Sequence, residues 1–362
     1  MPRKPYPTPL IIQPLSQEHT HTIIALHGRG SNAERFGYEL LASANLQARL
    51  PTVKFVFPTA SKRRSTILKK IPIHQWYDNY SLDDPGQRTH LQVDGLCETA
   101  EFLRGLITEE ARILGEGNHR KVILCGLSQG CAAGIFTLLG GWPDGNEAGI
   151  LGAFVGMSGW LPFEQQLQEI LQCDDNPTST GRSHHERPSE DDSDMESAQS
   201  DEASAAPVYS ESDDDDDDDD LFWQSSPSHD FNPFEEDEAE APLHIQAINH
   251  IRDILDLPLI SANEQSEDSQ PPSKLRHLEV PVFIGHGAED PKVSSTLGHK
   301  MSRLLSTGLR MDVKWKEYQG LGHWYRAEDE IEDILSFLRD HVGMSVKRNP
   351  SPDQTAEQAN QQ

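Results

Sequence analysis

Ser128 lies at the centre of a Gly-x-Ser-x-Gly motif that spans residues 126–130. An apolar run precedes the motif, and a stretch of small and apolar residues with helical character, 132–136, follows it. Glycines on both sides of the serine fit the sharp strand-to-helix turn of a nucleophile elbow, because a side chain two positions away would clash there. Such a turn presents the serine oxygen beside the N-terminal end of a helix, which favours an oxyanion. The motif therefore predicts a nucleophilic serine; the alternative is a glycine-rich turn with an incidental serine.

An aspartate and a histidine follow at places that suit a catalytic triad. A serine hydroxyl is a weak nucleophile at neutral pH, and it needs a histidine base that a carboxylate orients. Asp290 comes shortly after one apolar run, and His323 comes shortly after the next. We predict Ser128, Asp290 and His323 as nucleophile, acid and base. The alternatives are a turn aspartate, a surface-loop histidine and, for the acid, the neighbouring Glu289.

The backbone of two further residues could stabilise an oxyanion. The sequence His27-Gly28-Arg29-Gly30 follows an early apolar run, and its glycines would let the backbone approach a ligand closely. An oxyanion hole takes one N–H from the residue after the nucleophile and another from a loop after an early strand. We therefore predict the backbone N–H groups of Arg29 and Gln129 as the two donors, with a plain glycine turn as the alternative.

Three other residues near the predicted strand ends fit structural roles as well as functional ones. Ser158 lies in the sequence Gly-Met-Ser-Gly-Trp, which resembles a second elbow. No helix of small residues follows it, so we expect a structural or pocket-lining role. For His286 we expect packing. Trp76 follows a basic loop, and it could form a wall of the substrate pocket or anchor that loop.

Short apolar runs recur along the chain and are typical of buried strands. Parallel strands that are buried on both faces are continuously apolar instead of alternating. Segments with helical periodicity lie between several runs, for example 93–114 and 327–342. Alternating strands and helices predict an α/β fold with a mostly parallel central sheet and helices on both faces. The apolar runs are 22–26, 53–57, 122–125, 152–157, 282–284 and 313–318.

The net charge of −28 is concentrated in one acidic tract. Residues 174–241 contain 25 acidic residues and two arginines, and eight successive aspartates occupy 213–220. The tract has too few apolar groups to offset the entropy of ordering, so we predict disorder there. Because the chain lacks clustered lysine and arginine, we exclude nucleic acid as a ligand. The tract could instead bind a basic protein partner.

The tract divides the predicted hydrolase-like domain into two parts. An insertion separates them, and apolar residues at helical intervals in its last third predict a short helix. A polar tail rich in proline and glutamine ends the sequence, and we predict disorder in it. The segments are 1–169 and 276–345 for the domain, 170–275 for the insertion, 242–260 for its helix and 346–362 for the tail.

Several classes of protein are excluded by what the sequence lacks. No apolar run approaches the roughly 20 residues of a membrane span, and no signal core follows the first residues. We expect a cytoplasmic or nuclear protein without stable membrane insertion. The four cysteines lack metal-ligand spacing, and we expect reduced thiols. Triad chemistry needs no metal and no organic cofactor, so we expect neither.

Six short motifs follow one another along the sequence. They are His27-Gly28-Arg29-Gly30, Gln75-Trp76-Tyr77-Asp78, Gly126-Leu127-Ser128-Gln129-Gly130, Ser158-Gly159-Trp160-Leu161-Pro162, Gly287-Ala288-Glu289-Asp290 and Gly320-Leu321-Gly322-His323. Together and in this order they resemble the phospholipase/carboxylesterase family of α/β-hydrolases, to which acyl-protein thioesterases belong. The resemblance covers most of residues 20–169 and 276–342 and fits a fungal-type member with an acidic insertion.

The resemblance implies a function as well as a fold. It implies the same triad, with an apolar groove for an acyl chain in which Trp76, Trp160 and Leu161 are candidate pocket residues. The implied activity is that of an acyl-protein thioesterase, which removes palmitoyl groups from proteins. A general carboxylesterase or lysophospholipase is the first alternative, because the triad chemistry is identical. An inactive hydrolase fold that binds basic partners through its acidic tract is the second.

This sequence departs from the family pattern at three places. Arg29 occupies a position that is often aliphatic in mammalian relatives, and its side chain could favour anionic leaving groups. The run 291–293 lacks the proline that often follows its valine in the family. The insertion enters near the expected pocket rim, so the predicted helix 242–260 could act as a partial lid.

Overall fold

The structure of the chain is a computed structural model that describes residues 6–115, 117–143, 150–173, 241–261 and 273–348. The predicted disordered tract lies outside these residues apart from Ala241, and so does the tail from 349 onward. Within the described ranges, no helix is long and apolar enough to cross a membrane. All four cysteines are free thiols.

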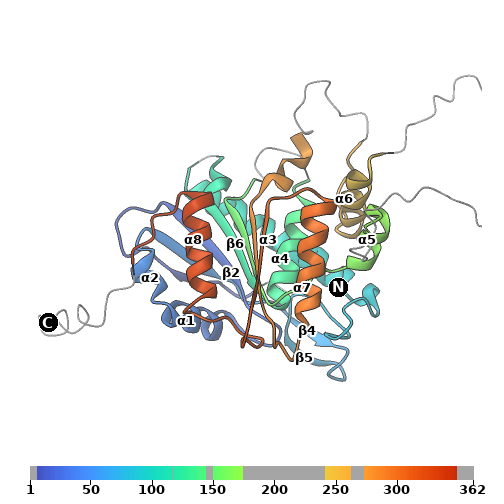
Figure 1. The fold of residues 1–362 in the computed structure, drawn as a ribbon, viewed down its shortest axis with the longest axis horizontal. Coiled ribbons are helices and arrows are strands. Elements are labelled where there is room, and N and C mark those ends of the chain that lie inside the picture. The colour runs from blue at the N-terminus through green and yellow to red at the C-terminus, as the bar shows by residue number, and fades with distance from the viewer. Residues whose placement is uncertain (1–5, 116, 144–149, 174–240, 262–272, 349–362) are drawn as a thin grey trace, which may run out of the picture. The chain divides into compact units, whose positions relative to one another are not determined.

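A seven-stranded sheet forms the centre of the fold (Figure 1). Its strands are β1 Leu10–Ile12, β2 His21–Leu26, β3 Val53–Phe57, β6 Val122–Leu127, β7 Ala153–Met157, β8 Val282–Gly287 and β9 Val313–Tyr318. They lie in the order β1-β3-β2-β6-β7-β8-β9, and all pairs are parallel except β1 with β3. Each predicted apolar run lies in a strand, apart from Gly152 directly before β7, so the predicted α/β fold is confirmed. A separate hairpin joins β4 Lys62–Ser65 to β5 Ile71–His74.

Helices cover both faces of the sheet. They are α1 Ala33–Ser43, α2 Leu46–Arg49, α3 Val93–Ile113, α4 Gln129–Gly140, α5 Glu164–Leu171, α6 Leu243–Ile254, α7 Ser295–Arg303 and α8 Glu330–Val342. Neighbouring side chains in a strand point to opposite faces, so Ile24 and Leu26 of β2 join one core and Ile23 and Ala25 join the other. α3, α4 and α7 contribute to the first core, and α1 and α8 contribute to the second.

The helix α3 buries the apolar residues that recur at helical spacing in its sequence. Its predicted apolar stripe is buried along its length, with no member more than 2% exposed. All residues of α4 are buried between the sheet, α3 and α6, and apart from Gln129 and Thr137 they are apolar or small. A helix that is buried on all sides is expected to be mostly apolar. The stripe of α3 consists of Leu96, Ala100, Leu103, Ile107 and Ala111.

The helix α6 lies in the segment for which we predict a helix. α6 packs against α4 and α5, and Arg252 of α6 donates a hydrogen bond to the carbonyl oxygen of Gly140 at 2.7 Å. α4 begins directly after Ser128 and ends at Gly140, about 18 Å away at 1.5 Å per residue. Arg252 therefore joins the C-terminal part of α6 to the end of α4 that lies away from Ser128. The partial lid stays a prediction.

Candidate active site

Ser128 lies in the turn between β6 and α4 in a conformation that few residues adopt. Its φ of 55° and ψ of −120° lie outside the regions that a residue with a side chain prefers, at a cost of about 1–3 kcal/mol. A Cβ at Gly126 would lie 2.4 Å from the carbonyl oxygen of Gly130, and one at Gly130 would lie 2.5 Å from that of Leu26. Both glycines of the motif are therefore required by the backbone, as the elbow predicts.

Three side chains from three strand ends form one hydrogen-bonded chain. The Nε2 atom of His323 lies 3.0 Å from the Oγ atom of Ser128. On the other side of the ring, Nδ1 lies 2.7 Å from the Oδ2 atom of Asp290. These residues follow β6, β8 and β9, whose carboxyl ends meet at one edge of the parallel sheet. The structure thus brings together all three residues that we predict as a triad.

The carboxylate of Asp290 is fully buried and has several hydrogen-bond donors. Its Oδ1 atom accepts hydrogen bonds from the backbone N–H groups of Lys292 and Val293 at 2.8 and 3.0 Å. Burial raises the pKa of Asp290, but the hydrogen bonds from His286, His323 and the turn outweigh it and hold this pKa below its usual range. Asp290 is therefore ionised at neutral pH.

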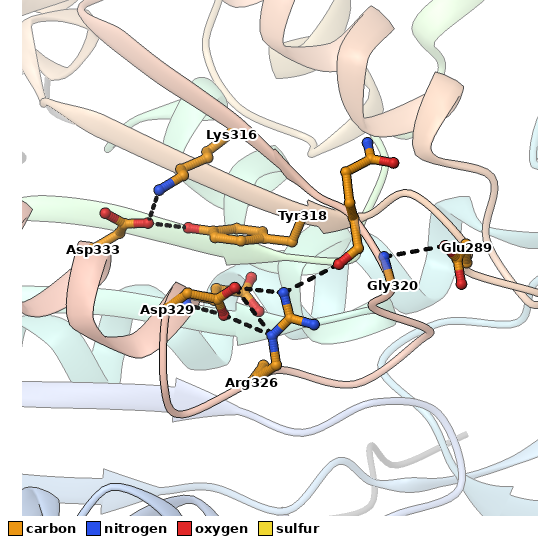
Figure 2. A network of polar contacts seen from close by, with 9 residues as sticks. Glu289, Lys316, Tyr318, Gly320, Arg326, Asp329 and Asp333 are labelled. Carbon is orange, nitrogen blue, oxygen red and sulfur yellow. Dashed lines mark hydrogen bonds and ion pairs between the residues drawn. The ribbon is translucent and has the colours of Figure 1, made fainter.

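Glu289, the rival acid, has a different position. Its Oε1 atom accepts a hydrogen bond from the backbone N–H of Gly320 at 3.1 Å (Figure 2). Glu289 thus joins the loop that carries Asp290, here called the acid loop, to the start of the loop that carries His323, here called the histidine loop. At the other end of the histidine loop, Arg326 forms an ion pair with Asp329 and donates a hydrogen bond to the carbonyl oxygen of Gln319 at 3.2 Å. Asp290, and not Glu289, is the acid that contacts His323.

The same network ties β9 to α8. Asp333 of α8 accepts a hydrogen bond from the hydroxyl of Tyr318 at 2.9 Å and forms an ion pair with Lys316 (Figure 2). Asp329, which pairs with Arg326, also caps the first turn of α8 by accepting from the N–H of Glu330 at 2.7 Å. These contacts hold the segment that presents His323 at both of its ends.

The predicted oxyanion loop passes directly beside Ser128. A Cβ at Gly28 would lie 3.5 Å from the Cβ of Ser128. The N–H of Gly30 already donates to the carbonyl oxygen of His74 at 2.7 Å. By contrast, the N–H groups of Arg29 and Gln129 donate to no acceptor in the described part of the chain. Both predicted donors are therefore available for a ligand.

His27 and Trp76 hold this loop in place. The N–H of Ala60 donates to Nε2 of His27 at 3.0 Å, so Nδ1 carries the proton and donates to the carbonyl oxygen of Gly28 at 2.7 Å. Burial lowers the pKa of His27 to about 4, which keeps the ring neutral. The indole N–H of Trp76 donates to the carbonyl oxygen of His27 at 2.7 Å. Trp76 thus anchors the oxyanion loop, whereas the sequence leaves open a wall of the pocket or an anchor of the basic loop before Trp76.

The side chain of Arg29 lies along the segment that follows Trp76. Its Nη1 atom is 3.4 Å from the carbonyl oxygen of Asn79, and Tyr77 and Asp78 lie nearby. Burial lowers the pKa of this guanidinium, while Tyr77 and Asp78 oppose that effect. A role in binding anionic leaving groups stays a prediction.

A cavity of about 190 Å³ is lined by Trp160 and Leu161, two of the three candidate pocket residues, and not by Trp76. Its lining contains none of the three predicted triad residues. The backbone before Trp160 approaches the nucleophile, because a Cβ at Gly159 would lie 3.3 Å from the carbonyl oxygen of Ser128. The other lining residues are Asp83, Asp84, Pro85, Gly86, Phe163, Glu164, Gln165, Leu297 and Lys300.

Ser158 resembles Ser128 in its backbone but not in its surroundings. It has a positive φ of 48°, and it is fully buried. Its hydroxyl has no hydrogen-bond partner among the described residues, and the next helix, α5, begins only at Glu164. Ser158 therefore lacks the base and the helix N-terminus that accompany Ser128. No cluster of three or more potential metal ligands occurs among the residues that the structure describes.

Comparison with known proteins gives a consistent family. A model of the phospholipase/carboxylesterase family matches residues 8–205. Acyl-protein thioesterase 1 of Yarrowia lipolytica is 32% identical over 162 residues, which are 44% of this chain and 66% of that protein. Acyl-protein thioesterase 1 of Schizosaccharomyces pombe is 31% identical, over 45% of this chain and 65% of that protein. The matches thus span slightly less than two thirds of these relatives.

A solved structure shows the same fold. The crystal structure of Zea mays acyl-protein thioesterase 2 aligns with a TM-score of 0.55 at 18% identity, over 93% of this chain and 100% of that one. At this level of identity the likeness concerns the fold alone.

Proposed function

The chain belongs to the phospholipase/carboxylesterase family of hydrolases, and from this premise we propose that it is a serine hydrolase that cleaves carboxylic esters or thioesters through an acyl-enzyme. The observation that carries the proposal is the hydrogen-bonded chain from Ser128 through His323 to Asp290, with spacings of 3.0 and 2.7 Å. Both distances lie in the range that proton transfer by a general base requires.

The proposed acylation step uses each group once. The Oγ atom of Ser128 attacks the carbonyl carbon while its proton passes to Nε2 of His323, and Asp290 stabilises the imidazolium that forms. The carbonyl oxygen becomes an oxyanion, which accepts hydrogen bonds from the N–H groups of Arg29 and Gln129. The bond to the leaving group then breaks, and His323 gives its proton to the leaving alcohol or thiol. An acyl-serine ester remains.

Deacylation repeats the cycle with water. His323 removes a proton from water as the water oxygen attacks the acyl-serine carbonyl, and the same two N–H groups hold the second oxyanion. Ser128 leaves with the proton that His323 returns, and the carboxylic acid is released. The buried, ionised Asp290 keeps the ring of His323 in the orientation and tautomer that both steps need.

The preferred substrate is an S-acylated protein, because similar proteins of Yarrowia lipolytica and Schizosaccharomyces pombe are acyl-protein thioesterases. In this proposal, the apolar side chains of Trp160 and Leu161 line the space for the acyl chain. Small esters and lysophospholipids are the alternative substrates, since the same triad cleaves them.

The test compares variants of Ser128 and Ser158, two serines that each have a positive φ angle. We expect wild-type protein to hydrolyse p-nitrophenyl esters and a palmitoyl thioester, and Ser128→Ala to lower kcat by at least about 10⁴-fold. Ser158→Ala is the matched control and should retain activity, because Ser158 lacks a base. Equal loss in both variants, or activity that survives Ser128→Ala, would refute the proposed nucleophile. If wild-type protein hydrolyses none of these substrates, the inactive scaffold becomes the better interpretation.

A further inference from the structure

His286 contacts the turn that presents Asp290. It lies in β8, four residues before Asp290, and its side chain is fully buried. Its Nε2 atom lies 3.0 Å from the carbonyl oxygen of Val293 and 3.3 Å from the Oδ2 atom of Asp290. A carbonyl and an ionised carboxylate can only accept hydrogen bonds, so Nε2 must carry a proton that both share.

The other side of the His286 ring is closed. Its Nδ1 atom is buried and has no hydrogen-bond partner in the described part of the chain. A Cβ at Gly298 of α7 would lie 2.4 Å from this atom, and the ring of Trp315 lies 6.3 Å away between centroids. With no acceptor at Nδ1, the geometry favours the neutral tautomer with the proton on Nε2, held in one orientation by α7 and β9.

We propose that His286 is a positioning residue that acts on the reaction through Asp290, an inference that rests on the proposed serine hydrolase function. Oδ1 of Asp290 is taken by the two backbone N–H groups of its own turn. Oδ2 lies between two imidazoles, with His323 towards Ser128 and His286 on the buried side. His286 thus holds the Asp290 carboxylate from the side away from Ser128. Through the carbonyl oxygen of Val293 it also holds the C-terminal end of the turn.

The second donor has an electrostatic consequence. The hydrogen bond from His286 draws part of the negative charge of Asp290 away from His323. Without it, the full charge of Asp290 would act on His323 and would stabilise more strongly the imidazolium that forms in the reaction. His286 therefore sets how much of the carboxylate charge acts on His323. A residue that only fills space would leave the charge on Asp290 unchanged.

The test measures how fast Ser128 reacts with a fluorophosphonate at each pH. In this reaction the Oγ–P bond forms, fluoride leaves, and the serine proton passes to His323, so the rate depends on the triad but not on the natural substrate. We expect His286→Leu to lower the plateau rate about 10-fold or more and to move the acid limb up by about half a pH unit or more. His286→Gln should restore both, because its amide N–H can reach the place of Nε2. An unmoved acid limb in folded His286→Leu would overturn the proposal.

A measurement on wild-type protein covers the case in which His286→Leu does not fold. Nitrogen NMR of the imidazoles should show His286 with its proton on Nε2 and none on Nδ1. A proton on Nδ1 alone would leave Nε2 as an acceptor facing the oxygens of Val293 and Asp290. That result would overturn the proposal. If the fluorophosphonate fails to label Ser128 in wild-type protein, the hydrolase function fails, while the NMR result still decides the position of His286.

Discussion

The side chain of Gln129 accepts a hydrogen bond from the backbone N–H of Trp76 at 3.0 Å and donates one to the carbonyl oxygen of Tyr77 at 2.9 Å. Trp76 in turn binds the carbonyl oxygen of His27 through its indole. The backbone N–H of Gln129 is therefore one proposed oxyanion donor. Its side chain holds the segment of Trp76, and Trp76 anchors the loop that carries the other donor, Arg29.

Replacing Gln129 by leucine should affect stability and catalysis together. The variant would leave the N–H of Trp76 and the carbonyl of Tyr77 buried without partners, at about 1–3 kcal/mol each. We expect the free energy of unfolding in urea to fall by about 2–5 kcal/mol. Because the oxyanion forms only in the transition state, kcat should fall about 10-fold while KM changes little. A stable Gln129→Leu protein with wild-type kcat would contradict this coupling.

The acid and histidine loops approach each other closely at Gly287. A Cβ at this residue would lie 2.2 Å from the carbonyl oxygen of Leu321 and 2.4 Å from that of Gly322. Both contacts are with backbone, which cannot move aside as a flexible side chain could. Gly287→Ala should therefore push His323 away from Asp290. A displacement of about 1 Å costs roughly 100-fold in rate, so we expect kcat to fall by at least that factor.

A second glycine gives the matched control for Gly287→Ala. Gly105 lies within α3, and a Cβ there would meet nothing within 4 Å. Gly105→Ala should leave kcat unchanged and stabilise the protein by about 0.5–1 kcal/mol, because alanine loses less conformational freedom in a helix than glycine does. Steady-state kinetics of both variants measures kcat, and thermal unfolding measures their stability. Equal kcat values would show that the loops tolerate separation.

The features that the sequence predicted correctly depend on local patterns. The apolar runs are long enough to identify strands, and the elbow at Ser128 follows from clashes that its flanking glycines avoid. Once parallel strands are identified, their carboxyl ends must meet at one edge. The proximity of Ser128, Asp290 and His323 then follows without any knowledge of side-chain packing.

The features that could not be predicted depend on contacts between distant residues. Trp76 anchors a carbonyl that lies 49 positions away in the sequence, and nothing near Trp76 indicates this. The position of α6 is decided partly by Arg252, which binds a carbonyl 112 positions away. For His286 a packing role was expected, because its spacing from Asp290 shows nearness but not the direction of the ring.

A buried ion pair joins the strand β3 to the helix α3. The Nζ atom of Lys54 in β3 lies 2.7 and 2.8 Å from the carboxylate oxygens of Glu110 in α3, and the hydroxyl of Thr22 also donates to this carboxylate. Both charged side chains are less than 10% exposed. Lys54→Met would leave a buried carboxylate unpaired, and we expect the free energy of unfolding to fall by about 3–5 kcal/mol.

An exposed ion pair on the same helix provides the comparison for Lys54→Met. Arg112 and Glu109 form a pair at 2.8 Å, with both side chains more than half exposed to solvent. Removing Arg112 should change the free energy of unfolding little, because water and salt screen an exposed pair. Adding Glu110→Leu to Lys54→Met should recover most of the lost stability, because the unpaired charge disappears. A double variant no more stable than Lys54→Met would argue against this explanation. Urea denaturation measures all three.

A buried carboxyl in α8 should make stability depend on pH. Glu330 is fully buried in the first turn of α8, and a Cβ at Gly285 would lie 2.3 Å from its Oε1 atom. Burial raises the pKa of Glu330 to about 8, so the folded protein holds a proton that the unfolded chain releases above about pH 4.5.

Stability must therefore fall as pH rises from about 4.5 to 8, because the unfolded state loses its proton first. At 1.36 kcal/mol per pH unit, wild-type protein should lose about 2–3 kcal/mol between pH 5 and pH 7 relative to Glu330→Gln, which has no proton to lose. Urea denaturation of both proteins at pH 5, 6, 7 and 8 measures the difference. The other titrating groups are common to the two proteins and cancel. Parallel stability curves over this range would show that Glu330 ionises normally in the folded protein.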